Sequence, residues 1–199
     1  MLTSVPAPAP APIGDWAEAC VRYVQDALGL PLDYTPETLP ILDHYVRTKA
    51  SEPSEPIRDL LATALGAYFG EVVRRSLEGV RWHVAGDTHS AYRIEFDAIF
   101  LHFNPLGIAL EVLAQSEAEL PASFQVLDEA RTIVEEALAQ GGEISPDDYY
   151  SFTIRYETLE LVISLLTGLE AKHQAAPRSF GAEVYRAASG ESVGNGVSS

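Results

Sequence analysis

Apolar residues in the first part of the chain recur at intervals of three and four, which places them on one face of an α-helix. This spacing predicts a first helix over residues 16–28, ended by Gly29. A second helix is expected to begin at "YTPETL", with Thr35 as its N-cap and Pro36 in its first turn. A third, from about 56 to 77, is apolar over so much of its surface that we expect it to be the central helix.

The pattern changes to alternation between residues 80 and 103. In "VRWHV", "YRIEF" and "IFLHF" every second residue is apolar, as in strands that bury one face. The apolar register slips by one at Asp97-Ala98, which predicts a tight turn there. We therefore expect three short antiparallel strands after the central helix, the last of them ended by Asn104-Pro105.

Helical spacing then returns over about 106–117, 121–139 and a long stretch that starts at Ser145. The sequence thus predicts an α+β fold, in which about six helices pack on a small three-stranded antiparallel sheet. Residues 1–12, which alternate Ala and Pro, predict a disordered arm, and the small, polar residues 174–199 predict a disordered tail. Residues 13–173 would form a single domain.

Two glycines interrupt the apolar run of the third helix. Gly66 and Gly70 lie four residues apart, and each lowers helix stability by roughly 0.5–1 kcal/mol relative to alanine. Together with Ala62 they line one edge of the helix with small residues, which lets another backbone approach closely. We expect the long C-terminal helix to lie there.

The net charge is −16. The stretch between residues 94 and 154 contains twelve acidic residues and a single Lys or Arg, Arg131. Such a field disfavours nucleic acid and anionic membrane surfaces, and it speeds encounter with a basic protein. The alternative interpretation is that the charge only maintains solubility. The candidate acidic binding face consists of Glu111, Glu117, Glu119, Asp128, Glu129, Glu135, Glu136, Asp147 and Asp148.

Signatures of catalysis and cofactor binding are absent from the sequence: it has no G-x-S-x-G, P-loop, G-x-G-x-x-G or H-E-x-x-H motif. His83, Asp87 and His89 lie close enough in sequence to suggest a metal site, but their spacing matches no known motif, and a hairpin loop is the preferred interpretation. The lone Cys20 lies on the apolar face of the first helix and is interpreted as a buried structural thiol. No cofactor or metal is predicted.

A second candidate site lies around the central helix and the strands. Glu71 precedes Arg75 by four residues, which favours a helix-surface ion pair. It is also a candidate carboxylate in a cleft with Trp82, Arg93 and His102, where His102 would be either a hydrogen-bonded structural residue or a base.

Part of the chain resembles a family of bacterial domains of unknown function. The resemblance rests on "DYTPETL" at 33–39, "GAYFGEV" at 66–72 and Trp82, and it covers about a quarter of the chain. It implies a bacterial domain in which Glu71 and Trp82 lie together, and it carries no activity that could be transferred.

Two functions are consistent with these features. The first is a non-catalytic, acidic cytoplasmic protein that binds another, basic protein as an adaptor, regulator or immunity-type partner. The second is a small-ligand-binding protein or hydrolase with a cleft near Glu71, Trp82 and His102. The N-terminus lacks the basic and apolar regions of a secretory signal, and no apolar run is long enough to span a membrane, which favours the cytoplasm.

Overall fold

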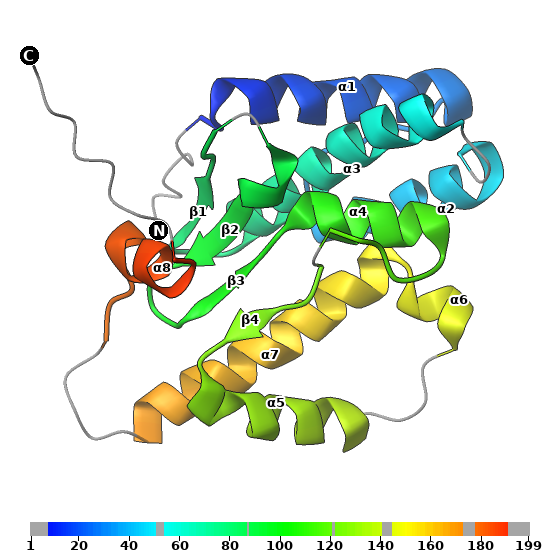
Figure 1. Ribbon diagram of the computed structural model, residues 1–199. Coiled ribbons are helices and arrows are strands. Elements are labelled where there is room, and N and C mark those ends of the chain that lie inside the picture. The colour runs from blue at the N-terminus through cyan, green and yellow to red at the C-terminus, as the bar shows by residue number, and fades with distance from the viewer. Residues whose placement is uncertain are drawn as a thin grey trace, which may run out of the picture.

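The computed structural model describes residues 8–50, 54–86, 88–120, 122–140, 145–172 and 178–190. Its helices and antiparallel strands form an α+β fold, which confirms the expected fold class (Figure 1). The helices are α1 (Ala11–Leu28), α2 (Leu39–Lys49), α3 (Glu55–Ser76), α4 (Pro105–Ala114), α5 (Asp128–Gln140), α6 (Pro146–Tyr149), α7 (Phe152–Lys172) and α8 (Ala182–Ala188), with 3-10 turns at Pro36–Thr38 and His89–Ala91. The strands are β1 (Val80–His83), β2 (Arg93–Phe96), β3 (Leu101–Phe103) and β4 (Gln125–Val126).

Helix α3 is the central helix, as its wide apolar surface predicts. Every residue from 61 to 73 is buried, and the helix lies between α1 and α4 (Figure 1). Cys20 of α1 is fully buried against this core, and burial raises the pKa of its thiol, in agreement with a structural role. The helix expected at Thr35 begins there as the 3-10 turn Pro36–Thr38, with Thr35 as its N-cap, and α2 follows it directly from Leu39. Asp33 Oδ1 accepts hydrogen bonds from Thr35 N at 3.0 Å and Thr35 Oγ1 at 2.6 Å.

The sheet has four antiparallel strands in the order β1-β2-β3-β4 rather than the three predicted. The added strand, β4, is only two residues long, and so short a segment shows too little alternation to be recognised in sequence. The register places Trp82 opposite Ile94, and Ile94 opposite Phe103, on the face that packs on the core. The polar residues of the alternation occupy the other face.

The two glycines of α3 do allow a close approach, but the predicted neighbour is wrong. A Cβ on Gly66 would lie 2.7 Å from Leu106 Cα, at the start of α4, and one on Gly70 would overlap the indole ring of Trp82. The start of α4 and the indole of β1, rather than the C-terminal helix, occupy this edge.

The long helix expected from Ser145 is divided in two. Residues 146–149 form α6, and α7 begins at Phe152, where the Asp43 carboxylate of α2 accepts hydrogen bonds from Phe152 N at 2.7 Å and Thr153 N at 3.1 Å. A side chain distant in sequence therefore caps the N-terminus of α7.

Part of the predicted disordered tail is ordered. In the described segment 178–190, α8 places Tyr185 at 0% exposure, and its hydroxyl donates to Phe96 O at 2.6 Å and accepts from Leu101 N at 3.1 Å. For this segment the prediction is wrong, because contacts with the β2–β3 turn outweigh its polar composition. Residues 173–177 and 191–199 lie outside the described residues, as do residues 1–7 of the predicted arm, and α1 begins at Ala11.

Candidate functional site

Glu71 and Trp82 lie together, as the resemblance implies. Trp82 Nε1 donates to Glu71 Oε1 at 2.9 Å, and the same carboxylate accepts from Arg74 Nε at 2.7 Å, Arg74 Nη2 at 2.8 Å and Arg75 Nε at 3.1 Å. Glu71 is 0% exposed. Burial by itself raises the pKa of this carboxyl, but the hydrogen bonds from Arg74 and Trp82 and the charge of Arg74 outweigh it, so the pKa is lowered. The carboxylate is held ionised inside the protein and presents no open cleft.

The two segments that carry the resemblance meet next to this carboxylate. Tyr68 OH accepts from Tyr34 N at 3.0 Å and lies 2.7 Å from Thr38 Oγ1, while the rings of Tyr34 and Tyr68 stack at 5.0 Å. The guanidinium of Arg75, which pairs with Glu71, lies 3.7 Å from the centroid of the Tyr34 ring. The "DYTPETL" and "GAYFGEV" segments therefore form one continuous network.

The sheet separates the four residues of the predicted cleft. Trp82 lies on the core face with Ile94, whereas Arg93 and His102 occupy alternate positions of β2 and β3 and lie on the opposite face. Glu71 and Trp82 therefore do not share a cleft with Arg93 and His102, and this part of the prediction is wrong. The alternation in the strands could have predicted this separation, because Trp82 is one of its apolar positions and Arg93 is one of its polar positions.

Arg93 and His102 do line one groove together. It has a volume of about 490 Å³ and runs from the turn that precedes β2 to the end of α8, with Asn104, Ser123 and Gln125 along its polar wall. His102 is half-buried in this groove, whereas Arg93 is buried in its wall.

Beside this groove, the polar face of the sheet contains a buried carboxylate that sequence reasoning missed. Glu95 is 0% exposed, and it accepts hydrogen bonds from Arg81 Nε at 3.0 Å and Arg93 Nε at 2.8 Å. His83 Nδ1 lies 3.9 Å from the same carboxylate. The cluster is covered by the C-terminal segment, whose Phe180 carbonyl accepts from Arg81 Nη2 at 2.9 Å.

The histidines considered for a metal have other neighbours. His89 packs edge-on against Trp16 at 5.3 Å and next to Tyr92 at 5.6 Å, and Asp87 lies outside the described residues. Within the part of the chain that the structure describes, no group of three or more His, Cys, Asp or Glu side chains is arranged to hold a metal ion.

The predicted acidic face is mostly on the surface, with two exceptions. Glu111 is buried on α4 and pairs with Arg155 of α7, so it does not belong to the face. The side chain of Asp147 is not among those that the structure describes. The remaining residues are exposed and are called the acidic surface below: Glu117, Glu119, Asp128, Glu129, Glu135, Glu136 and Asp148.

The acidic surface lies over three elements. α5 runs along one edge of the molecule, and the turn that follows α4 lies near α6, where Gln115 Nε2 donates to Tyr150 O at 2.9 Å (Figure 1). The four acidic residues of α5 line the helix opposite its buried residues, Ala130 and Val134.

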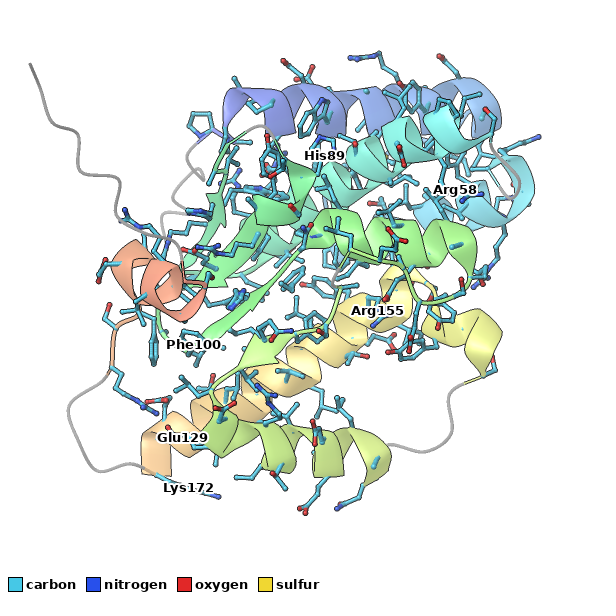
Figure 2. The ribbon with its side chains drawn as sticks, viewed as in Figure 1. Arg58, His89, Phe100, Glu129, Arg155 and Lys172 are labelled. Atoms are coloured by element: carbon cyan, nitrogen blue, oxygen red, sulfur yellow. The ribbon has the colours of Figure 1, made fainter. Side chains whose placement is uncertain are left out.

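Arg155 is a second buried charge that the sequence did not single out. Its guanidinium donates to Glu111 and, at 3.2 Å, to Tyr149 OH, and it lies 4.2 Å from the centroid of the Tyr149 ring (Figure 2). Its Nε is buried with no hydrogen-bond partner among the described residues. Burial raises the pKa of Glu111 although Arg155 lies beside it.

Comparison with known proteins identifies no relative: no protein-family model, no curated protein and no solved structure matches this chain significantly. Among the described helices, none is both long and apolar enough to cross a lipid bilayer.

Proposed function

We propose that this protein is a non-catalytic interaction module that binds another protein, of basic character, through the acidic surface. Such a module would act as an adaptor, a regulator or an immunity-type partner that neutralises a basic toxin. The observation that carries the proposal is the outward face of α5, where Asp128, Glu129, Glu135 and Glu136 are all exposed.

These charges differ from the buried carboxylates in their exposure: Asp128 and Glu129 form only exposed ion pairs among the described residues, with Arg131 and Arg178. Glu71, Glu95 and Glu111 are each buried and each paired with at least one arginine. Within the described residues, by contrast, Glu135 and Glu136 form no ion pair. Exposed charges of one sign attract a basic partner and raise its rate of association.

The test is recovery of a partner by the tagged full-length protein from its native extract, at low salt and at about 0.5 M salt. We expect one basic protein in near-equal amount at low salt and much less at high salt, because screening weakens attraction between exposed charges. Recovery of nothing at either salt would contradict the proposal.

A matched pair of variants then localises the binding surface. Replacing Glu129, Glu135 and Glu136 by lysine should abolish recovery, since it reverses the field of α5. The control replaces three exposed acidic residues of α1, which lies at the opposite edge of the molecule (Figure 1), with the same change in net charge: Asp15, Glu18 and Asp26. Equal loss in both variants would show that overall charge, and not this surface, attracts the partner.

A small-ligand-binding function is the second candidate, and the groove lined by Arg93 and His102 favours it. Because Glu71 is buried and fully hydrogen-bonded, this candidate no longer includes it. The test is a thermal-shift screen of small polar molecules. A compound that raises the unfolding temperature of the wild type, but not that of His102→Gln, would support binding in this groove.

A further inference from the structure

A groove with apolar walls lies between α5 and α7, at the end of the acidic surface. Its volume is about 380 Å³, and its walls include Leu127, Ile133, Leu166 and Leu169. Ile133 is 41% exposed although it is a large apolar residue of α5. Figure 2 shows Phe100, Glu129 and Lys172, which also line the groove, at the end where α5 begins and α7 finishes.

The chain places one of its own arginines at the rim of this groove. Arg178 Nε donates to Glu170 Oε2 at 2.8 Å, its Nη2 also donates to Glu170, and both Nη atoms lie 3.3 Å from Glu129 Oε1. The paired carboxylates belong to α5 and α7, on opposite sides of the groove. The rim thus holds a guanidinium in the two-pronged geometry that carboxylates prefer.

We propose that the groove between α5 and α7 is the docking site for a segment of the partner in which an arginine lies next to an apolar residue, and that Arg178 occupies the arginine position in the free protein. The proposal rests on the function proposed above, because it assumes that the partner is basic. The partner's arginine would replace Arg178 between Glu129 and Glu170. Its apolar neighbour would fill the groove beside Ile133.

The charges at the rim favour such an exchange. With Arg178 in place, the two carboxylates face two cations, Arg178 and Lys172, so the rim is balanced. When Arg178 leaves, the rim has an excess of one negative charge, which an incoming arginine restores to balance.

The contact with Glu129 is the exposed arm of this arrangement. The side chain of Arg178 is 40% exposed and that of Glu129 is 62% exposed, so solvent screens their attraction, whereas Glu170, which accepts two hydrogen bonds from Arg178, is 22% exposed. The exchange of one arginine for another gains little free energy by itself. The favourable free energy of binding would come from burial of the partner's apolar side chain in the groove.

The experiment titrates the full-length protein with acetyl-Leu-Arg-Leu-amide and follows the methyl resonances of Ile133 and Leu166 by NMR. The comparison peptide carries citrulline in place of arginine, which keeps the shape and removes the charge. We expect Arg178→Ala to bind the arginine peptide about two- to five-fold more tightly than the wild type, because the exposed pair no longer competes. The citrulline peptide should show no such gain.

Two further variants separate the rim from overall charge. Arg186→Ala removes the same charge from the same segment. Among the described residues the Arg186 side chain donates to Ala182 O and does not contact the rim, so the affinity of this variant for the peptide should equal that of the wild type. Adding Glu170→Gln to Arg178→Ala should remove the gain, since the recognising carboxylate is lost. Unfolding temperatures check that each variant is folded.

The inference is overturned if Arg178→Ala and the wild type bind the peptide equally or not at all, or if Arg186→Ala gains as much as Arg178→Ala. Its failure is distinguishable from failure of the proposed function. If a basic partner is recovered in a salt-dependent manner but peptide affinity does not change in Arg178→Ala, only the proposal for the groove is rejected. If no partner is recovered, the proposed function itself is rejected.

Discussion

Two carboxylates of this protein illustrate opposite uses of the same chemical group. Glu71 of α3 is 0% exposed and accepts four hydrogen bonds, from two arginines and a tryptophan. Glu129 of α5 has a side chain that is 62% exposed and shares a single arginine with Glu170. The first joins the central helix to the sheet, whereas the second contributes little to the fold and remains accessible to a partner.

This contrast separates the charged residues that maintain the fold from those that are available for binding. In α3 and β2 the structure buries two carboxylates, Glu71 and Glu95, and pairs each with arginines. On α5 it leaves the acidic side chains on the surface. Mutations in the first region should therefore lower stability, and mutations in the second should alter binding alone.

The largest effect is expected at Gly66. Leucine there would force side-chain atoms into the backbone of α4, since even a Cβ would lie 2.8 Å from Pro105 O and 2.9 Å from Leu106 N. Gly66→Leu should lower the free energy of unfolding by at least about 3 kcal/mol or prevent folding, as measured by denaturant titration.

A second glycine provides the control for this change. Gly168 lies inside α7, and a Cβ there would have nothing within 4 Å. Gly168→Ala should therefore raise the free energy of unfolding by about 0.5–1 kcal/mol. An unfolding temperature of Gly66→Leu equal to that of the wild type would refute the close packing of α3 on α4.

An intermediate effect is expected at Glu71. Glu71→Gln keeps the shape of the side chain but leaves Arg74, whose side chain is 9% exposed, without its counter-charge. The free energy of unfolding should fall by about 2 kcal/mol near neutral pH, measured by denaturant titration. Glu18→Gln, which disrupts an exposed pair with Arg22, should change it by less than about 0.5 kcal/mol.

The pH dependence of this effect has a definite sign. The pKa of Glu71 in the folded protein lies below its ordinary value of 4.5, so its contribution is fully present above that value and is lost as the pH falls through the lower, folded pKa. The stability difference between the wild type and Glu71→Gln should therefore narrow on acidification below pH 4.5. A difference that stays constant down to pH 2 would contradict the ion pair.

The smallest effect on stability is expected on α5. Replacing Glu129, Glu135 and Glu136 by lysine should change the free energy of unfolding by no more than about 0.5 kcal/mol, because these side chains are exposed. A loss comparable to that of Glu71→Gln would mean that α5 uses its charges structurally, and the contrast between the two regions would disappear.

Much of the local structure could be predicted from residues close together in sequence. The wide apolar surface of α3, the buried Cys20 and the alternation in the first three strands all correspond to what the structure shows. The acidic residues of α5 could also be placed on a helix surface from their spacing. These features depend on the periodicity of apolar residues, which can be recognised within a few turns of a helix or a few residues of a strand.

The candidate site was predicted less well, because it depends on which faces meet. Trp82 was correctly associated with Glu71, but Arg93 and His102 lie beyond the sheet from them. Glu111 carried the same charge as its neighbours in sequence, and only its burial beside Arg155 removes it from the acidic surface.

The α+β class, the central helix and the concentration of negative charge follow from the sequence alone, because each arises from residue type and local spacing. Which polar groups are buried depends on the tertiary packing. Asp43 caps α7 from more than a hundred residues away, and Tyr185 anchors a polar segment to the β2–β3 turn. Such contacts form because buried polar groups require partners, and the nearest partner in space is set by packing, not by distance along the chain.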